Sequence, residues 1–271
     1  MKSTNRIVTT LERLKSEKRK AFIPYIAAGV PGKEETIKIA LMLAEEGAAI
    51  LELGYPFSDP MADGVVNQLA ASRALEKGVT DIMYLDMIRS IRAQSDIPLI
   101  VFSYLNPIYR LGLRAFATRA KEAGADGFLL VDLPAEEADE MVSICRELDL
   151  CLIFLAAPTT TSERLERIMS KSSGFLYYIS RTGITGEREN FQSDFEKKLT
   201  KIRAGSYLPV VVGFGISTPE QVRTVCSLCD GAVVGSALVR RTLEPKPFVD
   251  MLQELRSLVQ PLIAPTKEIW N

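Results

Sequence analysis

The stretch PVVVGFGISTPEQVRTVCSLCDGAVVGS (209–236) decides the fold, because it places one helical pattern between two strand-like runs. Both runs are apolar on successive residues, as expected of strands that are buried on both faces of a parallel sheet. The segment between them, PEQVRTVCSLC (219–229), has apolar residues at the spacing of an amphipathic helix. Thr218 can cap this helix and Pro219 suits its first turn. The stretch therefore predicts a strand–helix–strand unit of a parallel sheet.

The same unit recurs along the whole chain. Helical patterns such as EETIKIALMLAEEG (34–47) and ADEMVSICRELDL (138–150) alternate with six further strand-like runs, which are FIPYIAA (22–28), AILELG (49–54), LIVFSY (99–104), GFLLVD (127–132), CLIFLAA (151–157) and FLYYIS (175–180). Glycines near several helix ends suit left-handed caps, and they are Gly47, Gly124 and Gly205. Eight alternations in 271 residues predict an α/β protein with a single (β/α)8 (TIM) barrel. An open doubly wound sheet is the structural alternative.

The two ends of the chain are expected to lie outside the eight repeats. Residues 3–18 have the pattern of an extra N-terminal helix, so we divide the chain into that helix (1–20), the barrel (21–260) and a tail (261–271). The last outer helix is expected at 248–259, and the tail is expected to be loosely held.

Charge and hydropathy exclude several classes of protein. The 33 Lys and Arg residues nearly balance 34 Asp and Glu residues, whereas nucleic acid or an anionic membrane calls for a concentrated basic face. The first 20 residues lack the continuous apolar run of a secretory signal. No segment approaches the ~20 apolar residues of a membrane span. We therefore expect a cytoplasmic protein with neither nucleic acid nor membrane as its partner.

The sequence contains no histidine. This removes the commonest general base and the commonest metal ligand, so carboxylates are the first candidates for acid/base work. The four cysteines do not suggest a disulfide framework in a chain of this length. Cys226 and Cys229 form a CxxC pair without a second pair or a histidine, which fits neither a zinc site nor a convincing redox site. We expect no metal.

The active site of a (β/α)8 barrel lies at the carboxyl ends of its strands. There the segment LELGYPFSDPMADG (51–64) places Glu52 inside an apolar run and Asp63 at the far end of a loop rich in proline. The ordinary interpretation of Glu52 is a solvated or salt-bridged residue, since an unpaired buried carboxylate is costly. Two carboxylates in separate environments would instead suit acid/base chemistry.

Two glycine-rich turns predict a phosphate site. GFGIS (213–217) follows the seventh strand and GSA (235–237) follows the eighth, which are the loops where barrels frequently bind phosphate. Backbone N–H groups at the start of a helix can donate to the anion. SRTGITGE (180–187) suits a loop that closes over a substrate, although it could be an ordinary flexible connection.

These segments together resemble the tryptophan synthase α subunits, which cleave indole-3-glycerol phosphate to indole and glyceraldehyde 3-phosphate. The similarity runs in order from FIPYIAAGVPG (22–32) through VDLPAEE (131–137) to GSALV (235–239). By this resemblance Glu52 is the general acid/base, which protonates the indole ring and takes the proton of the side-chain hydroxyl before retro-aldol cleavage. Asp63 is the second catalytic carboxylate, which hydrogen-bonds the ring N–H.

The resemblance also assigns the remaining site residues. The indole pocket comprises Tyr25, Phe102, Tyr104, Leu129, Tyr177 and Phe214. The phosphate cradle comprises Gly186, Gly213, Gly215, Gly235 and Ser236, and loop closure falls to Thr185 and Arg181. The expected partner is a β subunit in an α2β2 complex, which would carry pyridoxal phosphate (PLP) while this chain binds no cofactor. It would face loops bearing Pro56, Asp59, Asn106 and Pro134.

The sequence also departs from the family pattern. After ADG the family usually reads Pro-x-Ile-Gln, and this chain reads Val-Val-Asn-Gln (65–68). The loop that carries Asp63 therefore lacks that proline. Ala27 and Val30 stand where the family often has Thr and Asp. Three alternatives to a lyase working in the complex stay open. They are a mainly allosteric subunit that has lost cleavage, a free-standing lyase that releases indole, and a different phosphate-binding barrel such as an epimerase.

Overall fold

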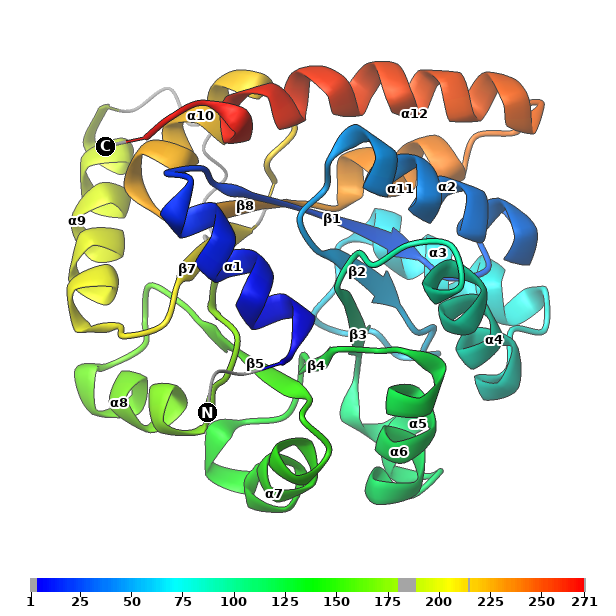
Figure 1. Cartoon of the computed structure of the whole chain (residues 1–271), viewed down its shortest axis with the longest axis horizontal. Coiled ribbons are helices and arrows are strands. Elements are labelled where there is room, and N and C mark those ends of the chain that lie inside the picture. Colours follow the sequence, from blue (N-terminus) through cyan, green and yellow to red (C-terminus); the bar gives the residue numbers. More distant parts are fainter. Residues whose placement is uncertain (1–3, 180–188, 214, 271) are drawn as a thin grey trace.

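The computed structural model describes residues 4–179, 189–213 and 215–270. Eight parallel strands close into a barrel in sequence order, and β8 pairs with β1 (Figure 1). The strands are β1 (Ala21–Ala27), β2 (Leu51–Gly54), β3 (Leu99–Ser103), β4 (Gly127–Leu130), β5 (Cys151–Ala156), β6 (Leu176–Ile179), β7 (Val210–Gly213) and β8 (Gly231–Val234). The predicted (β/α)8 barrel is confirmed, and the open doubly wound sheet is excluded.

The helices lie around this barrel. Those between β1 and β5 are α2 (Lys33–Glu46), α3 (Val65–Glu76), α4 (Asp81–Arg92), α5 (Leu105–Tyr109), α6 (Leu113–Ala123), η1 (Ala135–Glu137) and α7 (Asp139–Glu147). Those after β5 are α8 (Ser162–Lys171), α9 (Glu189–Gly205), α10 (Pro219–Leu228), α11 (Ser236–Thr242), α12 (Phe248–Ile263) and η2 (Ala264–Lys267). Thr218 caps α10 with Pro219 in its first turn, and Gly47 and Gly124 end their helices in the left-handed conformation, as predicted. Gly205 ends α9 without a left-handed turn.

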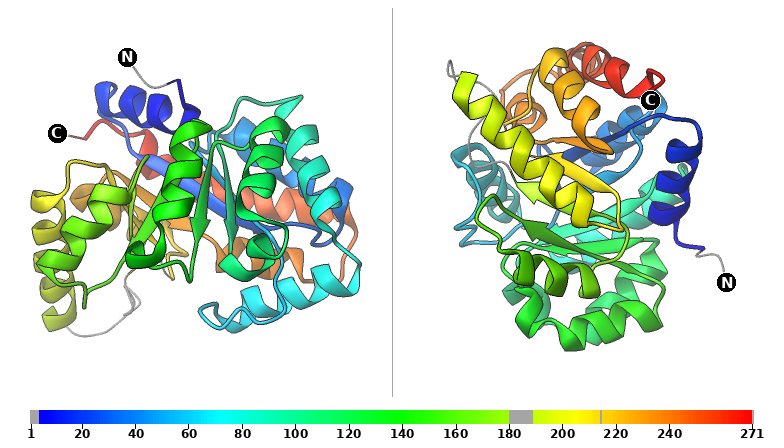
Figure 2. Two further views of the ribbon diagram at one scale, coloured as in Figure 1. Left: turned by 90° about the horizontal axis from the view of Figure 1, so that it is seen from below. Right: turned by 90° about the vertical axis from the view of Figure 1, so that its left-hand side faces the viewer.

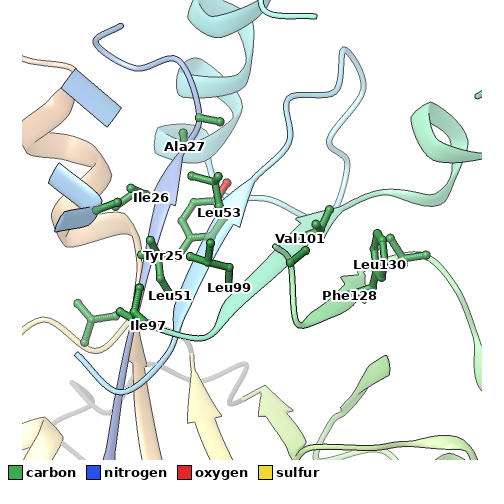
Figure 3. Close-up of a cluster of buried hydrophobic side chains, with 14 of the residues drawn as sticks. Tyr25, Ile26, Ala27, Leu51, Leu53, Ile97, Leu99, Val101, Phe128 and Leu130 are labelled. Carbon is green, nitrogen blue, oxygen red and sulfur yellow. The ribbon is translucent and has the colours of Figure 1, made fainter. Parts of the chain in front are cut away.

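Two apolar cores hold the molecule together. Along each strand successive side chains face opposite ways, so one set packs against the outer helices and the other fills the barrel. Figure 3 shows part of the outer core over β1 to β4, where Ile26, Leu53 and Val101 are labelled. The inner core contains Ile23, Ile50 and other inward residues of the strands. All eight strands are parallel, and their carboxyl ends therefore meet at one end of the barrel.

The extra N-terminal helix closes the other end. Helix α1 (Arg6–Ser16) packs Ile7, Leu11 and Leu14 against the inner core, and all three are buried. Asn5 caps α1 and donates from its side chain to the main-chain carbonyl oxygen of Asp126. Figure 2 places α1 at one end of the barrel and α3 at the other. The carboxyl ends of the strands are therefore the open end.

The expectation of a loosely held tail from residue 261 is wrong for the described residues. Helix α12 continues through Pro261 to Ile263, and the N–H of Trp270 donates to the main-chain oxygen of Lys18 at 2.8 Å. A proline inside a helix costs about 3 kcal/mol. Burying Leu262 and Ile263, each 1% exposed, contributes about 1.5–3 kcal/mol per side chain and offsets that cost.

No helix among the described residues has the length and apolar character needed to cross a membrane.

A buried carboxylate fixes the closed end of the barrel. Asp126, whose side chain is 3% exposed, accepts hydrogen bonds from Arg92 at 2.8 Å, from Arg6 at 3.0 Å and from the N–H of Leu99 at 2.8 Å. The acidic group thus ties α1, α4 and β3 to the turn before β4. Removing it would leave the two guanidinium groups and an amide without their partner.

We expect Asp126→Ala to lower the free energy of unfolding by about 3–5 kcal/mol, because it breaks a buried ion pair. Urea denaturation would measure the change. Asp139→Ala is the matched control, since Asp139 pairs with Lys171 but its side chain is 84% exposed, and such pairs contribute little. Equal losses in the two variants would contradict this account.

Candidate active site

A pocket of about 450 Å³ opens at the carboxyl ends of the strands, a volume typical of small-molecule sites. Its floor and walls come from inward-facing residues of six strands (β1, β2, β3, β5, β6 and β8) and from the loop before α3. The residues that line it include both predicted carboxylates. The full set is Tyr25, Glu52, Ala62, Asp63, Gly64, Val65, Val66, Asn67, Phe102, Val131, Leu155, Tyr177, Ile179, Gly215, Val233, Gly235, Ser236 and Arg240.

Glu52 is an acid held in an apolar environment. It lies on β2, where its neighbours in register are Tyr25 on β1 and Ile100 on β3. The residue is 1% exposed, and its Oε1 atom has no hydrogen-bond partner among the described residues. Burial raises the pKa of Glu52 from 4.5 to about 8, because the charged form loses its hydration. At neutral pH the carboxyl group is therefore protonated and can donate a proton. The solvated or salt-bridged alternative does not describe this residue.

Asp63 has a more polar setting at the end of the loop after β2. The hydroxyl of Tyr104 donates to its Oδ2 at 3.2 Å and accepts from the N–H of Ala62 at 2.9 Å. Burial raises the pKa of Asp63, while hydrogen bonds from Tyr104 and Asn67 lower it. The main-chain oxygen of Asp63 accepts from Gln68 at 2.8 Å. The structure thus places two carboxyl groups at one pocket in different environments.

Aromatic side chains form the apolar wall between the strands. Tyr25 and Phe102 pack edge to face with their ring centroids 4.9 Å apart, and Tyr177 lines the same pocket from β6. Two glycines make room for the tyrosines: a Cβ atom at Gly54 would overlap the hydroxyl of Tyr25, and one at Gly213 would overlap that of Tyr177. A flat ring could lie against this wall, since aromatic groups pack favourably in offset-stacked or edge-to-face arrangements.

The far rim of the pocket carries the candidate phosphate site. Gly215 lies there with φ +73°, and Gly235 precedes the first residue of α11, Ser236. Main-chain N–H groups at the start of a helix have no partner within it and can donate to an anion. Arg240 comes one turn later on α11 and lines the same pocket, so a cation stands beside the rim.

The structure separates some of the predicted substrate contacts. Gly213 lies in β7 beneath the hydroxyl of Tyr177 and does not line the pocket. Leu129 is fully buried in the inner core, one layer below the pocket, and Val131 takes the lining position. Tyr104 reaches the site through Asp63 and lines only a smaller cavity beside it. The predicted residues that lie outside the described ranges are Arg181, Thr185, Gly186 and Phe214.

The four predicted partner contacts all follow strands at the open end of the barrel. Pro56 and Asp59 lie in the loop after β2, Asn106 lies in α5 after β3, and Pro134 follows β4. Asp59 and Asn106 are exposed, Pro134 is partly exposed, and Pro56 is buried. Pro56 therefore supports the loop that carries Asp63 in this structure.

Sequence reasoning missed several residues of the pocket. Asn67 and Arg240 are its polar members, and the apolar ones include Val131, Leu155 and Val233. A signal for Arg240 was available, because residues four apart share a face of a helix and Ser236 was already a candidate. Asn67 was noted only as a departure from the family pattern.

Among the described residues, no group of three or more Cys, Asp or Glu side chains is placed to hold a metal ion. All four cysteines are buried and free. Burial is the largest cause that raises the pKa of Cys229 to about 12, so its thiol stays protonated and unreactive at neutral pH. The CxxC pair therefore behaves as core packing.

Comparison with known proteins gives one consistent result. A model of the tryptophan synthase alpha chain family matches residues 11–264. The tryptophan synthase alpha chains of Opitutus terrae and Geotalea daltonii are 44% and 46% identical to this chain; each alignment covers 87% of this chain, and they cover 88% and 89% of the two relatives. The crystal structure of tryptophan synthase subunit alpha from Legionella pneumophila str. Paris is 40% identical with a TM-score of 0.89, covering 97% of this chain and 98% of the other.

Fold and sequence relatives together define the chain as a (β/α)8-barrel lyase that cleaves a carbon–carbon bond. It belongs to the tryptophan synthase alpha chain family and catalyses the α reaction of tryptophan biosynthesis, the cleavage of indole-3-glycerol phosphate. The resemblance inferred from the motifs is confirmed, while the roles of individual residues stay predictions.

The raised pKa of Glu52 predicts a pH-dependent stability. The unfolded chain releases this proton near pH 4.5, whereas the folded protein keeps it to about pH 8, so wild-type stability is lost as the pH rises through that window. Glu52→Gln should match the wild type near pH 4.5 and be more stable at pH 8 by on the order of 4 kcal/mol. Chemical denaturation at both pH values would test this. Glu163→Gln, at a side chain 87% exposed, should show no such trend, and a gap for Glu52→Gln that stays constant with pH would contradict the assignment.

Proposed function

We propose that Glu52 is the general acid and base of the cleavage and that Asp63 is its electrostatic partner. The observation that carries this proposal is the buried, protonated carboxyl group of Glu52, whose Oε1 has no partner among the described residues, in the same pocket as Asp63. No imidazole is present to compete for the role, since the chain has no histidine. A general acid works best when its pKa lies near the working pH, which the burial of Glu52 provides.

The first step that we propose is protonation of the indole ring. Glu52 gives its proton to ring carbon C3, which converts the indole to an indolenine and weakens the bond to the glycerol side chain. The carboxylate so formed then accepts the proton of the hydroxyl on C1′, the side-chain carbon that is bonded to ring carbon C3. The C3–C1′ bond breaks in a retro-aldol step, which releases indole and glyceraldehyde 3-phosphate. One residue thereby serves as acid and as base.

Asp63 would act on the ring nitrogen. Its carboxylate accepts the ring N–H hydrogen bond and balances the positive charge that develops when C3 is protonated. Tyr104 and Asn67 donate to this carboxyl group and thereby favour its charged form, against the effect of burial. The aromatic wall of Tyr25, Phe102 and Tyr177 would bind the face or edge of the ring.

The phosphate group would lie at the opposite rim. Gly215, Gly235 and Ser236 can present main-chain N–H groups to it, and Arg240 adds a positive charge. Holding the phosphate at the rim fixes the ring near Glu52 and Asp63, because the substrate is then bound at both ends. On the family pattern, Gly186 is proposed to complete the phosphate cradle, and Thr185 and Arg181 are proposed to take part in closing the loop over the substrate.

We also propose that the chain works in the cytoplasm with a β subunit in an α2β2 complex. The family to which it belongs supports this partner. The β subunit would hold PLP and consume the indole, and this chain would bind no cofactor. The exposed residues Asp59 and Asn106 follow β2 and β3 at the same open end of the barrel as the pocket, where a partner could receive the product. The altered segment 65–68 favours an allosteric action on that β subunit as a second role beside the cleavage.

The decisive experiment is a steady-state assay of the purified chain with indole-3-glycerol phosphate, with and without a β subunit. We expect cleavage that Glu52→Gln lowers by about 10²–10⁴-fold, because the proton transfer is lost, while substrate binding stays largely intact. Wild-type turnover in this variant would show that the acid/base assignment is wrong. Stimulation of the β subunit without any cleavage would select the allosteric role. Cleavage at the same rate with and without a β subunit would select the free-standing lyase.

Ser236→Ala is expected to weaken substrate binding more than turnover. The serine begins α11 at the phosphate rim, and its hydroxyl adds one hydrogen bond to an anion, about 1.5–3 kcal/mol. Apparent affinity for the substrate should therefore fall by about tenfold to a hundredfold. Ser257→Ala on the exposed face of α12 is the control. An unchanged affinity in Ser236→Ala would count against the phosphate site.

A further inference from the structure

A second, much smaller cavity adjoins the substrate pocket. It has a volume of about 10 Å³ and lies between the ends of β1 to β3, the loop after β2 and α3. Tyr25, Asp63, Asn67 and Phe102 line both cavities, so they form the partition between the two. A cavity of this size is just large enough for one water molecule and too small for an organic ligand.

Two buried polar atoms belong to the lining of this small cavity. They are the Oγ of Ser103 and the Oδ1 of Asn67, and neither has a hydrogen-bond partner among the described residues. Ser103 is 1% exposed. It follows the inward-facing Phe102 on β3, and its side chain therefore points outward, toward α3. Buried polar groups in folded proteins are nearly always paired with protein or with ordered water. The expected occupant of the cavity is therefore one water molecule.

The small cavity lies directly behind the second carboxylate. Asn67 is the third residue of α3, and its N–H donates to the main-chain oxygen of Gly64 at 2.9 Å. Its side-chain amide also acts as a donor toward the carboxyl group of Asp63 and thereby lowers the pKa of that group. An amide donates only through its nitrogen, so the nitrogen serves Asp63 and the Oδ1 atom is left to accept from another group.

We propose that Asn67 and Ser103 hold one ordered water in this cavity, and that the two residues and the water position the carboxylate of Asp63. The hydroxyl of Ser103 donates to the water, and the water donates one hydrogen to Oδ1 of Asn67. Its second hydrogen is directed to Asp63, the charged acceptor of the cavity. This inference rests on the proposed role of Asp63 in the cleavage.

The proposal gives the altered segment a function. Where the family usually has a proline and an isoleucine, this chain has Val65 and Asn67. The proline would stiffen the start of α3 by fixing its backbone. Here the start of the helix is held to Asp63 through side chains: Gln68 donates to its main-chain oxygen, and Asn67 acts on its carboxyl group. An isoleucine at 67 could not act on the carboxyl group of Asp63 and would need no water.

The charged and titratable groups that face Asp63 in the described residues come from several elements. They are Tyr25 on β1, Glu52 on β2, Tyr104 after β3, Tyr177 on β6 and Arg240 on α11. Burial raises the pKa of all three tyrosines far above neutral pH, so they stay uncharged. Glu52 titrates near pH 8, and Asp63 is therefore the group expected to control the acidic limb of the reaction.

A high-resolution crystal structure of the wild-type chain tests the water directly. We expect one density peak within hydrogen-bond distance of both Ser103 Oγ and Asn67 Oδ1. Asn67→Leu should fill the cavity and remove the peak. A dry cavity in the wild type would overturn the proposal.

Titration of the Asp63 carboxyl carbon by NMR tests the positioning role without any need for activity. Asn67→Ala should raise the pKa of Asp63 by about 0.5–1 unit, since a donor to the charged form is lost. Ser103→Ala should raise it by less, and the double variant should show less than the sum, because both residues act through one water. Gln68→Ala is the matched control: this amide serves only the main chain of Asp63, so the pKa should not move. An unshifted pKa in Asn67→Ala would overturn the proposal.

The pH profile of the cleavage supplies the kinetic test. Asn67→Ala should move the acidic limb of kcat/KM to higher pH and lower kcat by about threefold to tenfold, the worth of a hydrogen bond, with little change in KM. An acidic limb that stays in place in an active enzyme would overturn the positioning role. A wild-type chain that shows no cleavage would refute the proposed function, and the crystal structure and the NMR titration would still decide the water site.

Discussion

Closure of the sheet between β8 and β1 is the constraint on which the site depends. Ala21 pairs with Gly231 and Pro24 with Val234, and Gly231 is needed there because a Cβ atom would overlap the backbone of Ala21. A closed ring of eight strands leaves a limited interior, which side chains from distant parts of the sequence must share. Tyr25, Glu52 and Tyr177 meet in it for this reason. A carboxyl group placed in this interior loses its hydration.

The chemistry follows from where each carboxyl group lies relative to this ring. Glu52 is on a strand, among apolar neighbours, and its proton is retained at neutral pH. Asp63 is on the loop above, where hydroxyl and amide groups can donate to it. The fold thereby separates an acid from a carboxylate within one pocket. The rim of glycines and the start of α11 lie on another side of the same pocket, so a substrate that spans it is held at both ends.

Local patterns predicted the fold well, because buried parallel strands are continuous apolar runs and helices show their own period. The sequence also indicated Glu52 and Asp63, since a carboxylate in an apolar strand and one in a stiff loop are unusual. The depth of each side chain inside the barrel was not predictable, because it depends on the register of the strands around the ring. Leu129 lies one layer below the pocket, and Gly213 contacts the hydroxyl of Tyr177. The tail was predicted wrongly because the cost of a proline inside the helix is offset by the burial of the side chains that follow it.

The two tyrosine–glycine pairs have an evolutionary consequence. Gly54 receives the hydroxyl of Tyr25, and Gly213 that of Tyr177. A Cβ atom at either glycine would overlap ring carbons as well as the hydroxyl of its tyrosine, so alanine becomes sterically admissible only once the whole ring is replaced by a smaller side chain. Substitutions within a pair are therefore epistatic. Homologous chains should exchange the two members together, and the order of those exchanges is constrained, with the tyrosine changing first.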